Sequence, residues 1–161
     1  MEDTGMEKTV ANGKLEITLP DGFHLMDEEE KNKLNVVAGG EFIAFTDPER
    51  HITATVGWRD LGLASLLVGS SDAVKTAEKQ IGDAMQRFGY EFTGFVDRNI
   101  SGRSCRGFDY TYRTGDTVMG GETCAMKSGR HMYFFNAYFR QEHKEESLDV
   151  WKGILASAVR I

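Results

Sequence analysis

The chain has 161 residues, of which 40% are hydrophobic and 27% are charged, and its formal net charge at pH 7 is −6. These values are typical of a globular domain that can bury a core without disulfides or metal. The acidic balance argues against nucleic acid as a partner, because binding phosphates needs a concentrated basic surface. No apolar run approaches the ~18 residues of a membrane-spanning helix, so we expect no membrane partner.

The N-terminal residues 1–12 are polar and acidic, and they resemble neither a signal peptide nor a lipoprotein leader. We therefore expect a flexible tail over residues 1–12 and a cytoplasmic location. No shift in composition marks a second domain, so we expect a single α+β domain over residues 13–161.

The first predicted strand is Leu15–Leu19, where apolar and polar residues alternate, and Pro20-Asp21-Gly22 ends it as a turn. Asp27 then begins a helix that we expect to run to about Ala38. Glu30 follows Asp27 by three residues, as in a capping box. The acidic run around Glu30 suits the positive end of a helix dipole, so it indicates a helix start rather than a metal site.

Two more strands, Glu41–Thr46 and His51–Trp58, flank a turn that contains Pro48. The pattern weakens over Arg59–Gly69, which we interpret as a long loop containing apolar residues. A second helix is predicted over Ser71–Phe88, with Ser71 as its cap. Its buried stripe comprises Val74, Ala77, Ile81, Ala84, Met85 and Phe88.

Four long strands follow, and tight turns join them. The breaks fall at Ser101-Gly102, Gly115-Asp116 and Ser128-Gly129, which are turn-forming pairs. Connections this short join only antiparallel neighbours, because a parallel pair needs a crossover of about a dozen residues. The predicted strands are Tyr90–Ile100, Arg103–Thr114, Thr117–Ser128 and His131–Arg140.

A last amphipathic helix is predicted over Glu142–Val159, and we expect Trp151 to anchor it on the sheet. Amphipathic helices need a sheet face to cover. The pattern therefore predicts an α+β fold, with an antiparallel sheet of about six to seven strands between helices in an α/β/α sandwich. The apolar face of this last helix comprises Leu148, Trp151, Ile154, Leu155 and Ala158.

The opening Leu15–Phe23, with its strand, Pro20, Gly22 and aromatic Phe23, resembles the start of the Mog1/PsbP-like fold family. The later elements follow in the same order: a helix, a run of long antiparallel strands and a C-terminal helix near a tryptophan. The resemblance implies an antiparallel sheet flanked by helices and a mostly non-catalytic role. The family includes a nuclear-transport factor that binds a small GTPase and a photosystem extrinsic subunit. No functional residue of these relatives can be matched to a position here.

The tripeptide Ser-Gly-Arg occurs twice, at Ser101-Gly102-Arg103 and at Ser128-Gly129-Arg130. In an antiparallel meander these two turns lie at the same end of the sheet. We expect Arg103 and Arg130 to lie close together there, with Arg98 and Lys127 nearby. Such a basic end could hold a carboxylate, a phosphate or an acidic protein surface. Alternatively, these are two unrelated solvated turns with charges that protect the sheet edges.

The predicted meander is also rich in aromatic residues. Phe108, Tyr110 and Tyr112 share one face by the alternation of a strand, and core packing is one explanation for them. The other is that the tyrosines line a groove that the helices leave uncovered. We therefore treat Tyr110 and Tyr112 as candidate binding residues. Both faces of His131–Arg140 are apolar, which predicts a central strand.

The two cysteines, Cys105 and Cys124, fall on neighbouring predicted strands. If Thr114 faces Thr117 across a two-residue turn, Cys105 faces Met126 and Cys124 lies one diagonal step away. A disulfide is then conceivable. Two buried free thiols in a reducing compartment are the alternative that we favour, since two cysteines are no disulfide framework.

No sequence motif for a catalytic, nucleotide or metal site is present, and we expect no cofactor. Gly120-Gly121 interrupts a strand pattern and suggests a β-bulge. We expect a non-enzymatic binding or accessory module that engages a protein partner. The alternative is a small-molecule-binding domain or weak hydrolase, with His51 or His131 as the base near Tyr110.

Overall fold

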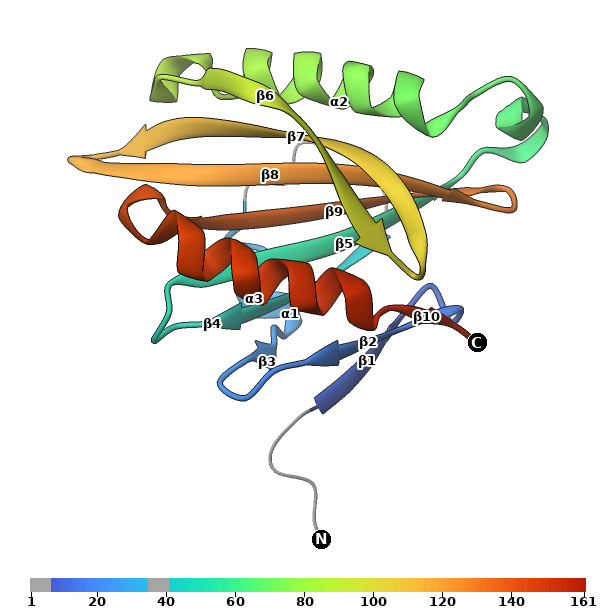
Figure 1. The fold of residues 1–161 in the computed structure, drawn as a ribbon, viewed down its shortest axis with the longest axis horizontal. Coiled ribbons are helices and arrows are strands. Elements are labelled where there is room, and N and C mark those ends of the chain that lie inside the picture. Colours follow the sequence, from blue (N-terminus) through green and yellow to red (C-terminus); the bar gives the residue numbers. More distant parts are fainter. Residues whose placement is uncertain (1–6, 35–40) are drawn as a thin grey trace, which may run out of the picture.

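A computed structural model describes residues 7–34 and 41–161 of the chain, and Figure 1 shows how their helices and strands are arranged. The α-helices are α1 (Glu28–Lys31), α2 (Ser70–Ala84) and α3 (Lys144–Ser157). The strands are β1 (Glu7–Ala11), β2 (Leu15–Leu19), β3 (His24–Leu25), β4 (Glu41–Asp47), β5 (Ile52–Asp60), β6 (Glu91–Ile100), β7 (Arg103–Thr114), β8 (Thr117–Ser128), β9 (His131–Arg140) and β10 (Val159–Arg160).

Seven strands form the main sheet, in the order β3-β4-β5-β9-β8-β7-β6, and every neighbouring pair is antiparallel. The predicted α+β class and the four-strand meander are therefore confirmed. Thr114 does face Thr117 across the β7–β8 turn. Strand β9 is the central strand, as the apolar character of both its faces predicted.

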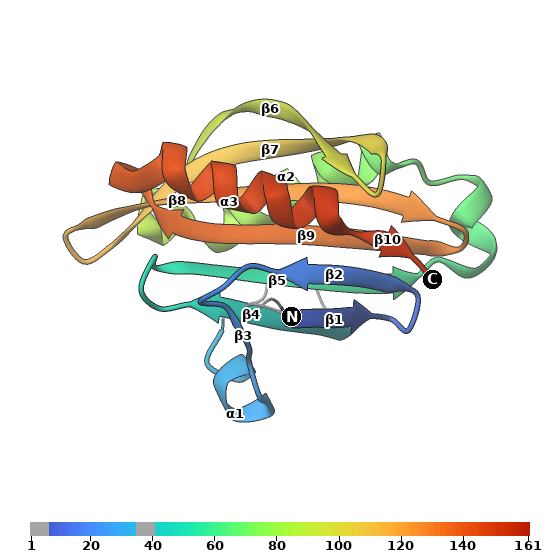
Figure 2. The same cartoon turned by 60° about the horizontal axis from the view of Figure 1, so that its bottom comes forward.

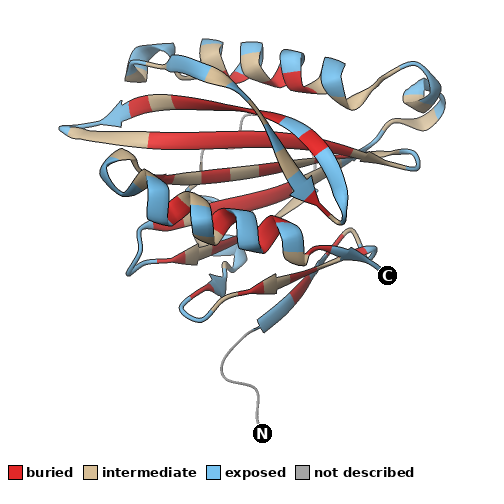
Figure 3. Cartoon of the chain, viewed as in Figure 1, coloured by how far each residue is buried: buried red, intermediate tan, exposed pale blue. Residues whose placement is uncertain are grey.

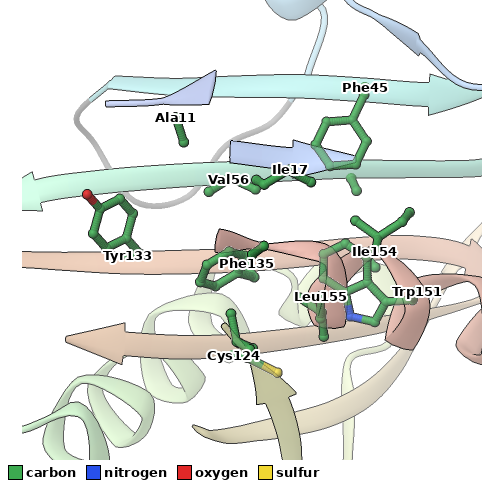
Figure 4. Close-up of a cluster of buried hydrophobic side chains, with 14 of the residues drawn as sticks. Ala11, Ile17, Phe45, Val56, Cys124, Tyr133, Phe135, Trp151, Ile154 and Leu155 are labelled. Carbon is green, nitrogen blue, oxygen red and sulfur yellow. The ribbon is translucent and has the colours of Figure 1, made fainter. Parts of the chain in front are cut away.

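One face of the main sheet carries α3 and a small antiparallel sheet of order β1-β2-β10, and α2 lies behind the other face (Figure 2). The larger core cluster joins α3, the small sheet and the main sheet. Trp151 is fully buried in it, beside Ile154, Leu155 and Phe135 (Figure 4). The predicted anchoring of the last helix by Trp151 is confirmed.

The second core cluster lies between α2 and the opposite face of the sheet, and Figure 3 shows the buried stripe of α2 turned toward the strands. Val74, Ala77 and Ile81 of α2 are buried, as predicted. Ala84 is exposed, contrary to the prediction, because the regular helix ends there and the chain turns into a short 3-10 helix over Gln86–Phe88. None of the described helices has the length and apolar character to cross a bilayer.

Several elements differ from the prediction. Glu7–Ala11 pairs with β2 as strand β1, so the expectation of a flexible tail is wrong for these residues. Burial alternates along the end of this strand, but the polar composition of the N-terminal residues gave no sign of it. The capping box of Asp27 and Glu30 is present, but α1 ends at Lys31, so the prediction of a helix is wrong for residues 32–34, and its remaining part to Ala38 lies outside the described residues.

The Gly120-Gly121 pair forms no bulge, since its pairing with β7 and β9 is regular. A β-carbon on Gly120 would lie 2.4 Å from Phe139 Cε1, and one on Gly121 would lie 2.3 Å from Tyr110 Cζ. Each glycine thus makes room for an aromatic ring on its own face of the sheet. The irregularity in the meander lies instead in β6, between Phe92 and Gly94.

The first four residues of β7 do not pair with β8. The β7–β8 pairing stops at Gly107 and Cys124, and residues 103–106 pair with β6 alone. Figure 1 shows the β6–β7 hairpin curling across the face that carries α3. Cys105 therefore does not pair with Met126, and both cysteines are buried free thiols.

Candidate docking surface

The loop between β5 and α2 presents three leucines to solvent. Leu63 is 95% exposed, Leu66 is 89% exposed and Leu67 is 85% exposed. A 3-10 helix over Gly62–Leu66 contains Leu63 and Leu66, whose spacing of three residues places them on the same side of it, and Leu67 directly follows its last residue. Figure 3 shows this segment as a largely exposed protrusion. We refer to residues 61–68 as the leucine loop.

The base of the leucine loop is tied to the β8–β9 turn. The backbone N–H of Leu61 donates to the carbonyl oxygen of Arg130 at 2.7 Å, and Lys127 Nζ donates to the carbonyl oxygen of Ser65. Asp60 accepts from the backbone N–H of Gly62 at 2.8 Å and from Arg130 through both carboxylate oxygens, at 3.2 and 2.5 Å. The loop is therefore held in place while its leucines remain uncovered.

The ion pair at the loop base is reflected in the pKa values of both partners. The hydrogen bond from Arg130, and then the one from the Gly62 backbone, lowers the pKa of the Asp60 carboxyl. The hydrogen bond to Asp60 raises the pKa of Arg130. Both side chains are largely exposed, so we regard the pair as a positioning contact rather than a source of stability.

A basic cleft of about 560 Å³ lies between the β8–β9 turn and the small sheet, and Arg130, which binds the base of the leucine loop, also lines this cleft. Arg130, Lys14 and Arg160 line it, and Leu15 and Tyr133 are among its apolar residues. Pairing of β10 with β2 places Arg160 opposite Leu15, next to Lys14 in the chain. Three cationic side chains thus gather on a protein whose formal charge is −6.

The leucine loop, the β8–β9 turn, the β6–β7 turn and β10 all lie toward one end of the molecule, at the right in Figures 1 and 2. We call this part the docking end; it comprises the leucine loop, the basic cleft and Arg103. Arg103 is exposed, and it takes part in none of the ion pairs of the described residues.

Arg98 is not part of the docking end. Its guanidinium donates to both carboxylate oxygens of Glu122, at 2.9 and 2.7 Å, and Glu122 is fully buried. Trp151 Nε1 also donates to Glu122, at 2.9 Å. The expectation that Arg98 contributes to a basic end is wrong, because the curl of the β6–β7 hairpin carries Arg98 over the sheet face, where the buried carboxylate binds it.

Asp109 faces Glu122 across the β7–β8 pair and is also buried. The pKa of Asp109 is raised to about 7, mainly by burial and then by the hydrogen bond with Glu122 and the negative charge of that residue. Its Oδ1 atom has no hydrogen-bond partner among the described residues. Arg98, Glu122 and Asp109 form a buried charged group that joins β6, β8 and β7.

Tyr110 and Tyr112 lie beneath α2 and are buried, so they do not form an exposed protein-binding surface. They pack in a row of tilted rings, with ring centroids 6.0 Å apart. Of the two, Tyr110 borders a groove under α2.

The histidines do not assemble a catalytic site with Tyr110. His51 precedes the first residue of β5, whereas His131 pairs with Asp60 at the other end of that strand. Tyr110 lies three strands away from β5, which corresponds to about 14 Å. The structure therefore does not support a hydrolase with either histidine as its base. Among the described residues, no group of three or more His, Cys, Asp or Glu side chains is placed to hold a metal ion.

The sequence of residues 59–69 predicted a loop that contains apolar residues, but it did not mark the leucines of this loop as candidate binding residues. Leu63, Leu66 and Leu67 lie in a stretch whose hydrophobic periodicity is weak. This weak periodicity was the available sign that the leucines are not part of the core.

No protein-family model and no curated protein matches the chain. Solved structures do match it. A cyanobacterial PsbP protein, CyanoP, from Synechocystis sp. PCC 6803 is 15% identical with a TM-score of 0.73, over 99% of this chain and 95% of that one. LpqN of Mycobacterium tuberculosis, described as involved in cell envelope biogenesis, is 13% identical with a TM-score of 0.59, over 96% and 91% of the two chains.

The Ran-binding protein Mog1p of Saccharomyces cerevisiae is 10% identical with a TM-score of 0.50, over 94% of this chain and 87% of that one. At these identities the comparisons concern the fold and not the site. The chain therefore has the Mog1/PsbP-like fold that its opening residues resembled.

Proposed function

We propose that this chain is a non-enzymatic binding module that engages a protein partner through its docking end. The observation that carries the proposal is the exposure of Leu63, Leu66 and Leu67 on a loop whose base is tied down. Isolated surface leucines are ordinary, but three exposed leucines within five residues form an apolar patch of the kind that marks interaction sites.

The cost of forming such an interface is lowered by the contacts at the loop base. Arg130 and Lys127 hold the leucine loop through Asp60 and Ser65, so little ordering is needed when a partner binds. Burying a leucine side chain contributes about 1.5–3 kcal/mol. A few such anchors can dominate the affinity of an interface.

The basic cleft indicates the chemistry of the partner surface. Lys14 and Arg160 lie beside the Arg130–Asp60 pair, and they would complement acidic side chains that flank an apolar pocket. Such charges mainly raise the association rate and orient the partner. The Mog1p neighbour is described as Ran-binding, which supports the view that this fold can serve protein recognition.

The test is affinity capture with the full chain, from the cells that encode it, followed by reconstitution with the purified protein that is captured. We expect the triple variant Leu63→Ser, Leu66→Ser, Leu67→Ser to lose this protein. The matched control is Phe92→Ser with Phe95→Ser, which removes exposed apolar side chains of β6, and should keep it.

A second arm probes the basic cleft with the reconstituted pair. Lys14→Glu with Arg160→Glu should slow association, and the difference from the unmodified chain should shrink at high salt. The proposal is wrong if the triple leucine variant captures the same proteins as the unmodified chain. It is also wrong if the leucines join two copies of this chain, which sedimentation would show as a dimer that the triple variant abolishes.

A further inference from the structure

A groove of about 390 Å³ lies between α2 and the face of the main sheet that α2 covers. Helix α2 packs on β7 and β8, so the β9 side chains on this face are only partly covered. Ile81 and Met85 line the groove on the helix side, and Phe134 and Tyr138 of β9 line it on the sheet side. Largely apolar walls of this kind suit a small organic ligand.

Polar side chains form a row across the sheet at this groove. Asn136 Nδ2 donates to Thr55 Oγ1 at 3.1 Å, and Thr123 Oγ1 donates to Asn136 Oδ1 at 2.6 Å. Asn136 and Thr123 both line the groove. A side-chain amide has two N–H groups, and within residues 7–34 and 41–161 only one of those of Asn136 has a partner, so the other can donate to a ligand.

Tyr110 adds a second donor at the same place. Its ring lies over Gly121, where a β-carbon would come within 2.3 Å of the ring, and the side chain is only 2% exposed. Its hydroxyl is buried and makes no hydrogen bond of regular geometry among the described residues, although the hydroxyls of Thr123 and Tyr138 lie near it. Leaving a buried hydroxyl unpaired is unfavourable, so a ligand that accepts from it would gain that interaction. Burial raises the pKa of Tyr110 well above its ordinary value, so the hydroxyl stays protonated and can donate.

We propose that this groove binds a small, uncharged, planar molecule that carries a carbonyl-type acceptor. The aromatic side chains Phe134 and Tyr138 suit a planar body, and the Tyr110 hydroxyl supplies the donor for the acceptor. Among the described residues that line the groove, Arg87 is the one with a charged side chain, and its guanidinium lies over the Phe88 ring at 4.9 Å. A cationic ligand would lose its hydration without meeting a carboxylate among the described lining residues, and an anionic ligand would meet only Arg87, which is exposed to solvent. The site is separate from the docking end, so it does not depend on the proposed protein partner.

The test uses two probes of the same shape, acetophenone and α-methylstyrene, of which only acetophenone carries the carbonyl oxygen. Each is titrated into the full chain, and backbone amide chemical shifts are followed by NMR. We expect both probes to perturb the amides around the groove and acetophenone to bind more tightly.

Three variants make the test decisive. Tyr110→Phe should weaken acetophenone roughly 2- to 10-fold, the value of one hydrogen bond, and leave α-methylstyrene unchanged. Ala84→Phe, which adds a ring at an exposed groove position of α2, should abolish binding of both probes. Lys79→Phe adds the same ring at an exposed position of α2 outside the groove lining and should change neither.

The proposal is overturned if the perturbed amides lie elsewhere on the protein or if Tyr110→Phe weakens both probes alike. It is equally overturned if Ala84→Phe binds the probes as the unmodified chain does, or if benzoate binds more tightly than acetophenone.

Discussion

Replacing Arg98 by Met should strongly destabilise the fold, because it leaves the carboxylate of Glu122 buried without its cation. Glu122 is fully buried, and Arg98 donates to both of its oxygens at 2.9 and 2.7 Å. Breaking a buried pair by removing one partner costs about 3–5 kcal/mol. Trp151 Nε1 still donates to Glu122 in the variant, which favours the lower end, about 3 kcal/mol.

The assay is urea unfolding followed by tryptophan fluorescence and by circular dichroism. A loss of about 3 kcal/mol is a large fraction of the 5–15 kcal/mol expected for a domain of this kind. In a thermal melt the same loss lowers the midpoint by about 6–12 °C. The control is Arg106→Met: its ion pair with Asp97 is exposed at 3.8 Å, so the change should stay within about 0.5 kcal/mol.

A double-mutant cycle separates the buried charge from the packing of the arginine stem. Arg98→Met combined with Glu122→Gln removes both charges. The double variant should lose less free energy of unfolding than the sum of the losses of the two single variants. A loss below about 1 kcal/mol for Arg98→Met, or additive effects in the cycle, would show that Glu122 does not depend on Arg98 for its charge.

The remaining predictions concern pH and packing. The pKa of Asp109 in the folded protein is raised to about 7, above its ordinary value of 3.8. Asp109 therefore contributes stability to the folded state below pH 3.8, and this contribution is lost as the pH rises to about 7. Asp109→Asn should therefore gain stability over the unmodified chain between pH 5 and pH 8 in paired urea melts, by at most about 4 kcal/mol. Gly121→Ala should cost about 2 kcal/mol because the Tyr110 ring must move, whereas Gly153→Ala, which meets open space in α3, should raise the thermal midpoint slightly. Trp151→Ala should cost about 3–5 kcal/mol in a urea melt, and a loss below about 1 kcal/mol would contradict its place in the core.

The sequence predicted the long strands well because their limits depend on local chemistry. Gly102, Gly115 and Gly129 all have positive φ angles in the structure, which is the conformation that tight turns require and that glycine adopts without strain. Once the turns are placed, neighbouring strands and their register follow, as the facing of Thr114 and Thr117 shows.

The short strands could not be predicted in the same way. Val159 and Arg160 form β10 by pairing with residues of β2 that lie more than a hundred positions earlier in the chain. A two-residue strand has no periodicity to detect, and its pairing depends on how α3 ends against the small sheet. The same is true of β3, which pairs only His24 and Leu25 with β4.

The surroundings of the candidate site residues could not be predicted from the local sequence. Arg103 and Arg130 follow identical Ser-Gly pairs, so the sequence predicts equivalent roles for them, yet the structure gives them different surroundings. The difference arises because β7 pairs with β8 only from Gly107 onward, so that Arg103 lies outside this pairing, whereas β8 and β9 remain paired to their common turn at Ser128 and His131. Arg130 consequently stays beside β5, where Asp60 binds it and fixes the base of the leucine loop. A turn motif determines that an arginine lies at a sheet end, but the separation of two strands determines which partner that arginine meets.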